Sequence, residues 1–496
     1  MEPDQQLREG AAGTVTTEAE DEFAQLLRTS FRARTPDAET EAGNAVATLV
    51  RTAMEDQTVV SEDVFNTVRE MIARLDAKLS DQMNEILHNP EFQKLEGTWL
   101  GLKHLIENGE PDSTVWIQVM NISKDELIRS FADYTKDTWD RSPIFRKVYE
   151  TGLGTLGGKP IGCMIGDYQF DHSPADIGLL RNLGKIANAA HAPFFSAAAP
   201  NLLGLDSWNE LSVPHDIMKI FDEKQYAAWR SLRESEDARY IGLCLPRMAA
   251  RPVYGEDSVR VEAFNFEEET DGHAGEKYAW TNAAYAMGAN ICRAHKTHGW
   301  TVQIRGVKSG GEVVDLPMHS FETEDGDTDM KCPTETSITD RREAELSKAG
   351  LIALVHRQGS DRAAFIGGQS LYKPKKFKTA EATAADNLSS RLPYMFAVSR
   401  FAHYLKHMVR DQIGSTREAT QLQRELQNWI SQYVHASPAN ASEAEKARRP
   451  LAGAKVEVFE DPENPGYYMS KFFLRPHFQL EGMDIGMSLV SKLPQK

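Results

Sequence analysis

Between residues 113 and 200 the apolar residues of this chain change repeatedly between a period of two and a period near 3.6. Residues 115–119 alternate apolar and polar, which predicts a strand. Ser123 and Glu126 then form the capping box of a helix. The order continues with a strand in 159–170, a helix through Ile177, Leu180, Leu183 and Ile186, and a strand at 193–199. Strands that alternate with helices predict an α/β fold whose sheet is at least partly parallel.

Two amphipathic helices precede this region. Ser61 is a suitable N-cap for the first, which carries apolar residues at helical spacing from Val64 to Ile86. The second follows Pro90 and ends at Asn108-Gly109, with Phe92, Leu95, Trp99, Leu102 and Ile106 along it. We expect the two helices to form a helical hairpin with one shared apolar seam.

The middle of the chain is more polar. Residues 253–269 are acidic and strand-like, and a helix is expected over 278–294. Its Tyr278, Asn282, Tyr285 and Met287 are unusually aromatic for a surface helix. Residues 322–329, ETEDGDTD, predict an acidic loop, and the basic segment 373–383 predicts a domain boundary.

The last 110 or so residues are densely patterned. Residues 388–414 predict a helix. Residues 456–461 and 467–474 predict a β-hairpin with a turn at Pro465-Gly466, and 483–493 predict a third strand. Two interpretations of these strands stay open. They form an intramolecular sheet, or they pair with the edge of another subunit.

Length and pattern together give the domain organisation. A chain of 496 residues predicts about three domains. We expect a flexible segment at 1–60 with a short amphipathic helix, a core domain at 61–378 and a C-terminal domain at 384–496. The short helix places Phe23, Leu26, Leu27 and Phe31 on one face, which either docks on a partner or folds back on its own domain.

Composition excludes several classes of function. The net charge of −17 argues against nucleic acid as a partner. No apolar run approaches the roughly 20 residues that span a bilayer, and the N-terminus has no signal core, so we expect a cytoplasmic protein without membrane contact. Cys163, Cys244, Cys292 and Cys332 are scattered singly, which is typical of small buried residues in a reducing compartment.

The candidate catalytic motifs lack the neighbouring elements or residues that their chemistry requires. Gly152–Gly157, GLGTLG, matches the dinucleotide-binding pattern, but a helix precedes it and a strand follows, which is the reverse order. His295 and His298 lie three residues apart without a further metal ligand at a useful spacing. The sequence therefore predicts neither a cofactor nor a metal, and no catalytic residues.

Several ordered motifs carry a family resemblance. They are NPEFQKLEGTWLGLKHLI (89–106), the run from Gly166 to Pro200, CLPRM with the following YG (244–255), FNFEE (264–268), YAWTNAAYAMGA (278–289), SLYKPKKF (370–377), SRLPYMFAVSRFAHYLK (390–406) and LRPHFQL (474–480). Through them the chain, from about residue 60 to its end, resembles the large subunit of the type VI secretion contractile sheath, the TssC (VipB, ImpC) family.

The resemblance implies a structural subunit and not an enzyme. It implies a heterodimer with a small sheath subunit, a helical polymer of stacked rings around an inner tube, and attachment to a baseplate. Strands are shared between subunits in that family, which assigns this role to Val456, Val458, Tyr467, Tyr468, Phe472 and Phe473. Phe23, Leu26, Leu27 and Phe31 match the helix that a hexameric unfoldase ATPase grips, although residues 29–40 depart from the expected sequence.

Charged segments complete the expected contacts. Lys373, Lys375, Lys376 and the acidic residues 322–329 are candidates for tube or lattice contacts, or else lie in solvated loops. Two alternatives remain for the whole chain. One is the sheath protein of another contractile injection device, such as a phage tail, and the other is a nucleotide-binding enzyme that uses Gly152–Gly157.

Overall fold

The computed structural model divides the chain into two compact units. It describes residue 44 and residues 64–479, except 135–137, 214–215, 257, 324, 415–417, 436, 438–440, 461–467 and 478. Residues 1–86 and 254–268 belong to the smaller unit, and residues 87–253 and 269–496 to the larger.

The smaller unit contains helix α3 (Val64–Leu87), except for its last residue, and the segment 254–268. Asn84 of α3 donates a hydrogen bond from Nδ2 to the Glu267 carbonyl oxygen at 3.2 Å. The strands predicted within 253–269 are wrong, since the described residues there form only a single bridge, between Tyr254 and Val259. Ser61 lies outside the described residues, and the predicted helical hairpin, which would span both units, stays a prediction.

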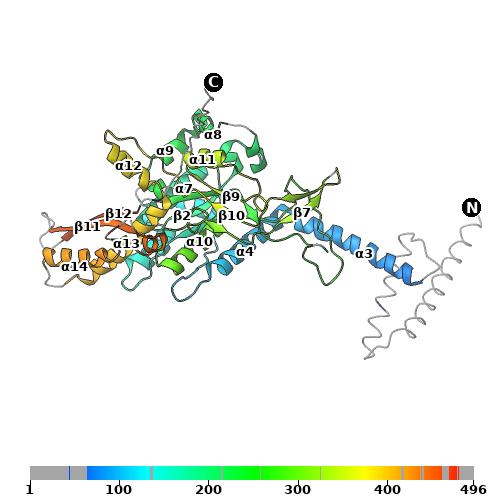
Figure 1. Ribbon diagram of the computed structural model, residues 1–496, viewed down its shortest axis with the longest axis horizontal. Helices are drawn as coiled ribbons and strands as arrows, with labels where there is room; N and C mark the ends of the chain where they lie inside the picture. Colours follow the sequence, from blue (N-terminus) through cyan, green and yellow to red (C-terminus); the bar gives the residue numbers. More distant parts are fainter. Residues whose placement is uncertain are drawn as a thin grey trace, which may run out of the picture. The chain divides into compact units, whose positions relative to one another are not determined.

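A six-stranded mixed sheet forms the centre of the larger unit (Figure 1). Its order is β1-β2-β3-β9-β10-β6. The first four strands are parallel, and the last two pairings are antiparallel, which confirms the predicted α/β class. The strands are β1 (Met164–Phe170), β2 (Phe194–Ala198), β3 (Ile241–Leu245), β9 (Leu351–His356), β10 (Ala363–Phe365) and β6 (Glu312–Val313).

Successive residues of the central strands enter two separate cores, because side chains alternate across a sheet. Phe194 faces a core that includes Leu180 and Trp229, whereas its neighbour Phe195 packs with Met287 and Phe396 in the second core. Figure 1 shows α7 and α11 on one side of the sheet and α10 and α13 on the other. These helices are α7 (Pro174–Ala190), α11 (Asp340–Lys348), α10 (Ala283–His298) and α13 (Leu392–Asp411). Helix α9 (Ala227–Arg233) carries Trp229 of the first core.

The shorter elements before the sheet agree only partly with the pattern. The Ser123–Glu126 capping box opens α5 (Lys124–Ala132) as predicted. The strand predicted at 115–119 is wrong, because these residues pair with no strand of the described chain and Val119 is 70% exposed. Further helical segments are η1 (Trp139–Arg141), α6 (Pro143–Phe145), the π-helix η2 (Arg146–Gly154), η3 (Pro200–Leu203), η4 (Trp208–Ser212), α8 (Ile217–Ile220), η5 (Lys224–Tyr226) and η6 (Glu236–Tyr240).

Helix α4 (Pro90–Gly109) packs closely on β5 (Trp280–Thr281) and α10, and two glycines permit the approach. A Cβ at Gly97 would stand 2.2 Å from the Trp280 carbonyl oxygen, and one at Gly101 would stand 2.2 Å from Thr281 Oγ1. Thr281 Oγ1 in turn donates to the Gly97 carbonyl oxygen at 2.7 Å. The left-handed C-cap of α4 is Glu110, one residue beyond the predicted Asn108-Gly109 end.

This packing also corrects the predicted surface helix at 278–294. The helix begins at Ala283, after its N-cap Asn282, and the aromatic residues expected at the surface are buried under α4 and the adjoining strands. The exposed fractions of Tyr278, Asn282, Tyr285 and Met287 are 6%, 6%, 7% and 0%. The local pattern failed because the covering elements come from elsewhere in the sequence.

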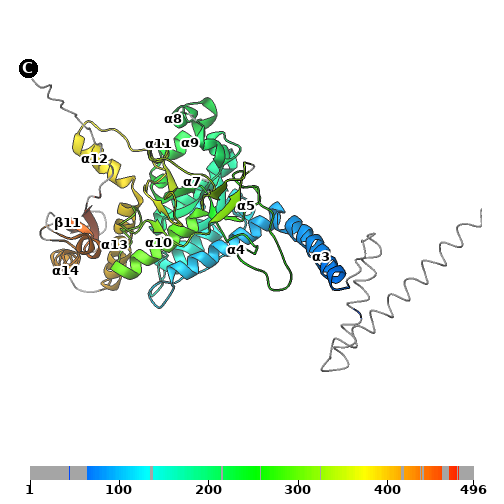
Figure 2. The same ribbon diagram turned by 45° about the vertical axis from the view of Figure 1, so that its right-hand side comes forward.

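The C-terminal part builds a third core around Phe401 and Ile430. Its hairpin pairs β11 (Leu451–Glu460) with β12 (Tyr468–Pro476) in antiparallel fashion, which confirms the predicted hairpin. Figures 1 and 2 both show this hairpin beside α14. The remaining elements are α12 (Ala380–Ser389), α14 (Ala419–Ser431) and α15 (Glu443–Arg448), with the two-residue strand β4 (Met248–Ala249) paired to β5.

Candidate functional site: the C-terminal hairpin and two charged segments

The predicted interface residues of the hairpin divide between its two faces. Val456 is 1% exposed, and Val458 and Phe472 lie half-buried against the same core. Tyr468 and Phe473 are 41% and 54% exposed. Tyr467, the turn at Pro465-Gly466 and the third strand predicted at 483–493 lie outside the described residues.

The hairpin is a two-stranded sheet in the described part of the chain. Opposite residues of an antiparallel pair share a face, so Val456 and its partner Phe472 both point into the core. The other face carries Phe473 and Lys471, whose Nζ lies 5.1 Å from the centre of the Phe459 ring. The hairpin is therefore amphipathic, with one face on the core and the other exposed, and β12 is an edge strand in the described part of the chain.

Two backbone amides hold the basic segment on the body, and its lysine side chains are exposed. Lys373, Lys375 and Lys376 are exposed, as predicted for a contact surface or a solvated loop. The Lys373 amide donates to the Arg233 carbonyl oxygen, and the Lys375 amide donates to Asp386 Oδ2 at 2.7 Å. These bonds present three cations on a fixed loop.

The acidic segment is a β-hairpin and not a loop. β7 (His319–Glu322) pairs with β8 (Thr328–Lys331), and residues 325–327 of the tip between them are exposed. Asp329 lies 2.9 Å from His273 Nε2. The prediction missed the strands because five carboxylates in eight residues depress strand propensity.

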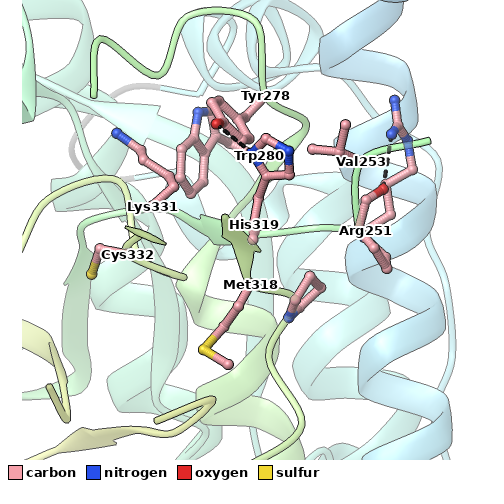
Figure 3. Close-up of a pocket in the computed structure, with 11 residues that line it drawn as sticks. Arg251, Val253, Tyr278, Trp280, Met318, His319, Lys331 and Cys332 are labelled. Carbon is pink, nitrogen blue, oxygen red and sulfur yellow. Dashed lines mark hydrogen bonds between the residues drawn. The ribbon is translucent and has the colours of Figure 1, made fainter. Parts of the chain in front are cut away.

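Lys331 fixes the base of this acidic hairpin on the larger unit. Its Nζ donates to the His273 carbonyl oxygen at 2.8 Å and lies 5.7 Å from the centre of the Trp280 ring. Burial lowers the pKa of Lys331. At the base of the same hairpin, Tyr278 Oη and Nδ1 of His319, the first residue of β7, are 2.9 Å apart (Figure 3).

The hollow among these side chains is too small for a substrate. Figure 3 shows the Lys331, Trp280 and His319 side chains around it, and its volume is about 10 Å³. That is room for about one water molecule, whereas ligand pockets usually measure about 300–1,000 Å³. The arrangement anchors the acidic hairpin.

The glycine motif has the geometry of a tight backbone turn. Gly152–Gly154 end the π-helix η2, and β1 begins only at Met164, so the helix precedes the strand as the sequence predicts. A Cβ at Gly158 would stand 2.3 Å from the Gly152 carbonyl oxygen. The glycines thus allow two backbone segments to touch.

The histidines and cysteines that were weighed as metal ligands form no metal site in the described residues. His295 and His298 occupy the last turn of α10, and burial lowers the pKa of both. In the described ranges no three His, Cys, Asp or Glu side chains gather where a metal ion could bind. Cys244 is buried as expected, whereas Cys163, Cys292 and Cys332 are half-buried.

The N-terminal candidates are outside the described residues, namely Phe23, Leu26, Leu27 and Phe31. No helix in the described ranges could span a membrane.

The sequence did not identify Gln423 and Gln427 of α14, whose side chains accept hydrogen bonds from backbone amides of β11. The two glutamines lie four residues apart beside the apolar face of α14. That spacing places them on one side of the helix but does not indicate that they bond to a strand.

Comparison with known proteins identifies the family. Residues 69–372 match the EvpB/VC_A0108 tail sheath N-terminal domain, and residues 381–493 match the tail sheath gpW/gp25-like domain of the same family. Over 484 residues the chain is 54% identical to the type VI secretion system sheath protein TssC1 of Pseudomonas aeruginosa strain PAO1, covering 98% of this chain and 97% of that protein.

Solved structures give weaker likenesses. The anti-feeding prophage baseplate structure has a TM-score of 0.37 and 9% identity, with 64% of this chain and 66% of that chain covered. The contracted helical sheath of the same prophage has a TM-score of 0.30 and 9% identity, covering 63% and 74%. Both scores are too low to carry an argument about this chain.

The two domain matches together define a contractile tail sheath protein. More particularly, the chain belongs to the EvpB/VC_A0108 family, the large sheath subunits of type VI secretion systems, as its motifs predicted.

Proposed function

We propose that this protein is the large structural subunit of a type VI secretion contractile sheath. In this role it pairs with a small sheath subunit, polymerises as stacked rings around an inner tube, and contracts to drive the tube and its spike out of the cell. The observation that carries the proposal is 54% identity to a named sheath protein along nearly the full length of both chains. That relative is a type VI protein, which favours this role over a phage-tail sheath.

We assign the protein no catalytic activity. The support is its membership of a structural family and a reversed helix–strand order at Gly152–Gly157. The energy for contraction would reside in the extended lattice, whose packed subunits switch together between two arrangements.

The expected partners are those of a cytoplasmic sheath. They are the small sheath subunit, the inner tube protein and the baseplate, with Lys373, Lys375, Lys376 and residues 322–329 as tube or lattice contacts. A hexameric unfoldase ATPase would grip the helix that carries Phe23, Leu26, Leu27 and Phe31. Neither nucleic acid nor membrane belongs to this set.

We assign the links between subunits to the C-terminal hairpin. Strand addition to an exposed sheet edge gives affinity through main-chain hydrogen bonds. Val456, Val458 and Phe472 build the hairpin on its core face, and Tyr468 and Phe473 are exposed where a partner would pass. Tyr467 and residues 483–493 complete the proposed contact.

Co-expression with the small sheath subunit, followed by negative-stain electron microscopy, tests the proposal. Long tubules that need both proteins are expected. Deletion of residues 456–496 should abolish them, and the smaller deletion of 483–496, which spares β11 and β12, should show whether the third predicted strand is needed. A discrete particle that forms without the partner and binds NAD or ATP would contradict the sheath assignment and support the glycine motif.

A further inference from the structure

The two edges of the C-terminal hairpin differ in how their backbone groups are satisfied. Edge strands normally present unpaired N–H and C=O groups that another strand can join. On β11 those groups are bonded to side chains of α14. On β12 no strand of the described chain lies along the outer edge.

Two glutamines occupy the β11 edge. The Val456 amide donates to Gln427 Oε1 at 2.9 Å, and the Val458 amide donates to Gln423 Oε1 at 3.1 Å. Gln427 Nε2 also donates to the Ala454 carbonyl oxygen at 3.2 Å. One residue in two along β11 is thereby bonded, which is the spacing that a neighbouring strand would use.

At the start of β11, backbone groups of the segment after α14 occupy the same outer edge. The Leu451 amide donates to the Tyr433 carbonyl oxygen at 3.2 Å, and the Leu451 carbonyl oxygen accepts from the His435 amide at 3.1 Å. From Leu451 to Val458 the outer edge of β11 is therefore joined to the chain's own α14 and to the segment that follows it.

The same bonds determine which groups of β12 point outward. Because the Val456 and Val458 amides point away from β12, their pairs with Phe472 and Ser470 are of the non-hydrogen-bonded kind. The amides of Phe472 and Ser470 then face the outer edge of β12. Ser470 and Phe472 are thus the residues whose backbone an added strand would meet.

We propose that Gln423 and Gln427 act as a side-chain substitute for a strand, closing the β11 edge so that a terminal strand of another sheath subunit adds at β12. This inference rests on the proposed sheath function. It gives the hairpin one receptive edge, so that each subunit accepts its neighbour in one orientation, and it keeps free subunits from pairing edge to edge through β11.

Hydrogen exchange with mass spectrometry tests this on the wild-type heterodimer and its tubules. Polymerisation should slow exchange in peptides that cover 468–476 and leave 453–459 unchanged. Protection gained in 453–459 without a change in 468–476 would overturn the inference. If wild-type tubules do not form at all, the sheath function itself fails, whereas tubules with unchanged exchange in β12 overturn only the choice of edge.

Replacement of the two glutamines tests the closure directly. Gln423→Ala with Gln427→Ala should raise exchange in 453–459 about tenfold, because two amide bonds and one carbonyl bond are lost. The matched control, Gln421→Ala with Asn428→Ala, removes two exposed amide side chains from the same helix and should leave that exchange unchanged. Equal exchange in the two double variants would contradict the closure.

A proline on β12 tests assembly. Ser470→Pro removes an outward amide but no bond of the β11–β12 ladder. The variant should still bind the small subunit yet form no tubules. Normal tubules from a variant that has the wild-type exchange pattern in 453–459 would show that β12 is not the receptive edge.

Discussion

At the scale of single residues, Asp386 joins three segments of the larger unit. Its carboxylate accepts from Arg239 Nη2 at 2.6 Å, from Tyr372 Oη at 3.0 Å and from the Lys375 amide at 2.7 Å. The carboxylate is 8% exposed, and the Arg239 guanidinium lies 4.3 Å from the centre of the Tyr372 ring. One buried charge thus fixes α12 and the basic loop to the body.

Asp386→Ala should lower the free energy of unfolding by about 3 kcal/mol, because it removes the buried partner of Arg239 and leaves the guanidinium paired only with the exposed Glu236. Denaturant unfolding of the purified heterodimer measures this. Asp386→Asn, which keeps the shape and can still accept hydrogen bonds, should cost less. A loss below about 1 kcal/mol for the alanine variant would show that water replaces the carboxylate.

His403 predicts how stability depends on pH. Burial lowers its pKa to about 4, and its Nε2 lies 2.8 Å from the Ala190 carbonyl oxygen. In the unfolded chain the imidazole titrates near pH 6.5, so the unfolded state binds more protons between pH 6.5 and 4. The contribution of His403 to stability is complete above pH 6.5 and is lost as the pH falls toward 4, on the order of 3 kcal/mol.

His403→Gln, which can still donate to Ala190 but cannot titrate, should flatten the pH dependence of unfolding over this range. Thermal melting at several pH values measures the slope. His407→Gln, on the same helix, is the control and should keep a steeper slope than His403→Gln. Equal slopes in the two variants would remove His403 as a cause.

At the scale of elements, the contact of α4 with β5 and α10 depends on glycine. Gly→Ala within a helix usually stabilises by about 0.5–1 kcal/mol. At Gly101 the added methyl group would meet Thr281 Oγ1 at 2.2 Å and the Tyr285 ring at 2.4 Å. We therefore expect Gly101→Ala to destabilise the fold by about 1–3 kcal/mol through overpacking.

Gly178 of α7 provides the matched control, because a Cβ there meets no atom within 4 Å. Gly178→Ala should stabilise, which gives the two variants opposite signs in a comparison of melting temperatures. If both stabilise, α4 can shift outward without cost, and the close approach is not required for the fold.

At the scale of the whole molecule, the α/β class and the first two strands of the sheet could be predicted from sequence, because β1, α7 and β2 follow one another in the chain. The strands β3, β9, β10 and β6 were not predicted. The burial of Tyr278 and Tyr285 could not be predicted, because the covering residues come from elsewhere in the chain. Helix α4 covers Tyr285 from about 180 residues away, and Tyr278 packs with Val253 and His319. The acidic hairpin was missed because its carboxylates depress strand propensity, and because the contacts of Lys331 that secure it come from residues more than 50 positions away. The outer edge of β11 is closed by glutamine side chains of α14, and apolar periodicity does not predict such hydrogen bonds.

The charged segments give a prediction for assembly. Lys373→Glu, Lys375→Glu and Lys376→Glu together should reduce the yield of sedimentable tubules several-fold, if these cations contact acidic groups of the tube or lattice. The triple arginine variant keeps the charge and should assemble normally. Wild-type yield from the glutamate variant, at both low and high salt, would assign the lysines to a solvated loop.

The order of the sheet has a consequence for synthesis. β3 pairs in parallel with β9, where Leu243 lies opposite Leu351, about a hundred residues later. At about 5–20 residues per second, a ribosome needs roughly 5–20 s to make the intervening chain. For that time β3 is paired only with β2 and its other edge has no strand beside it, which exposes the growing sheet to pairing with other nascent chains.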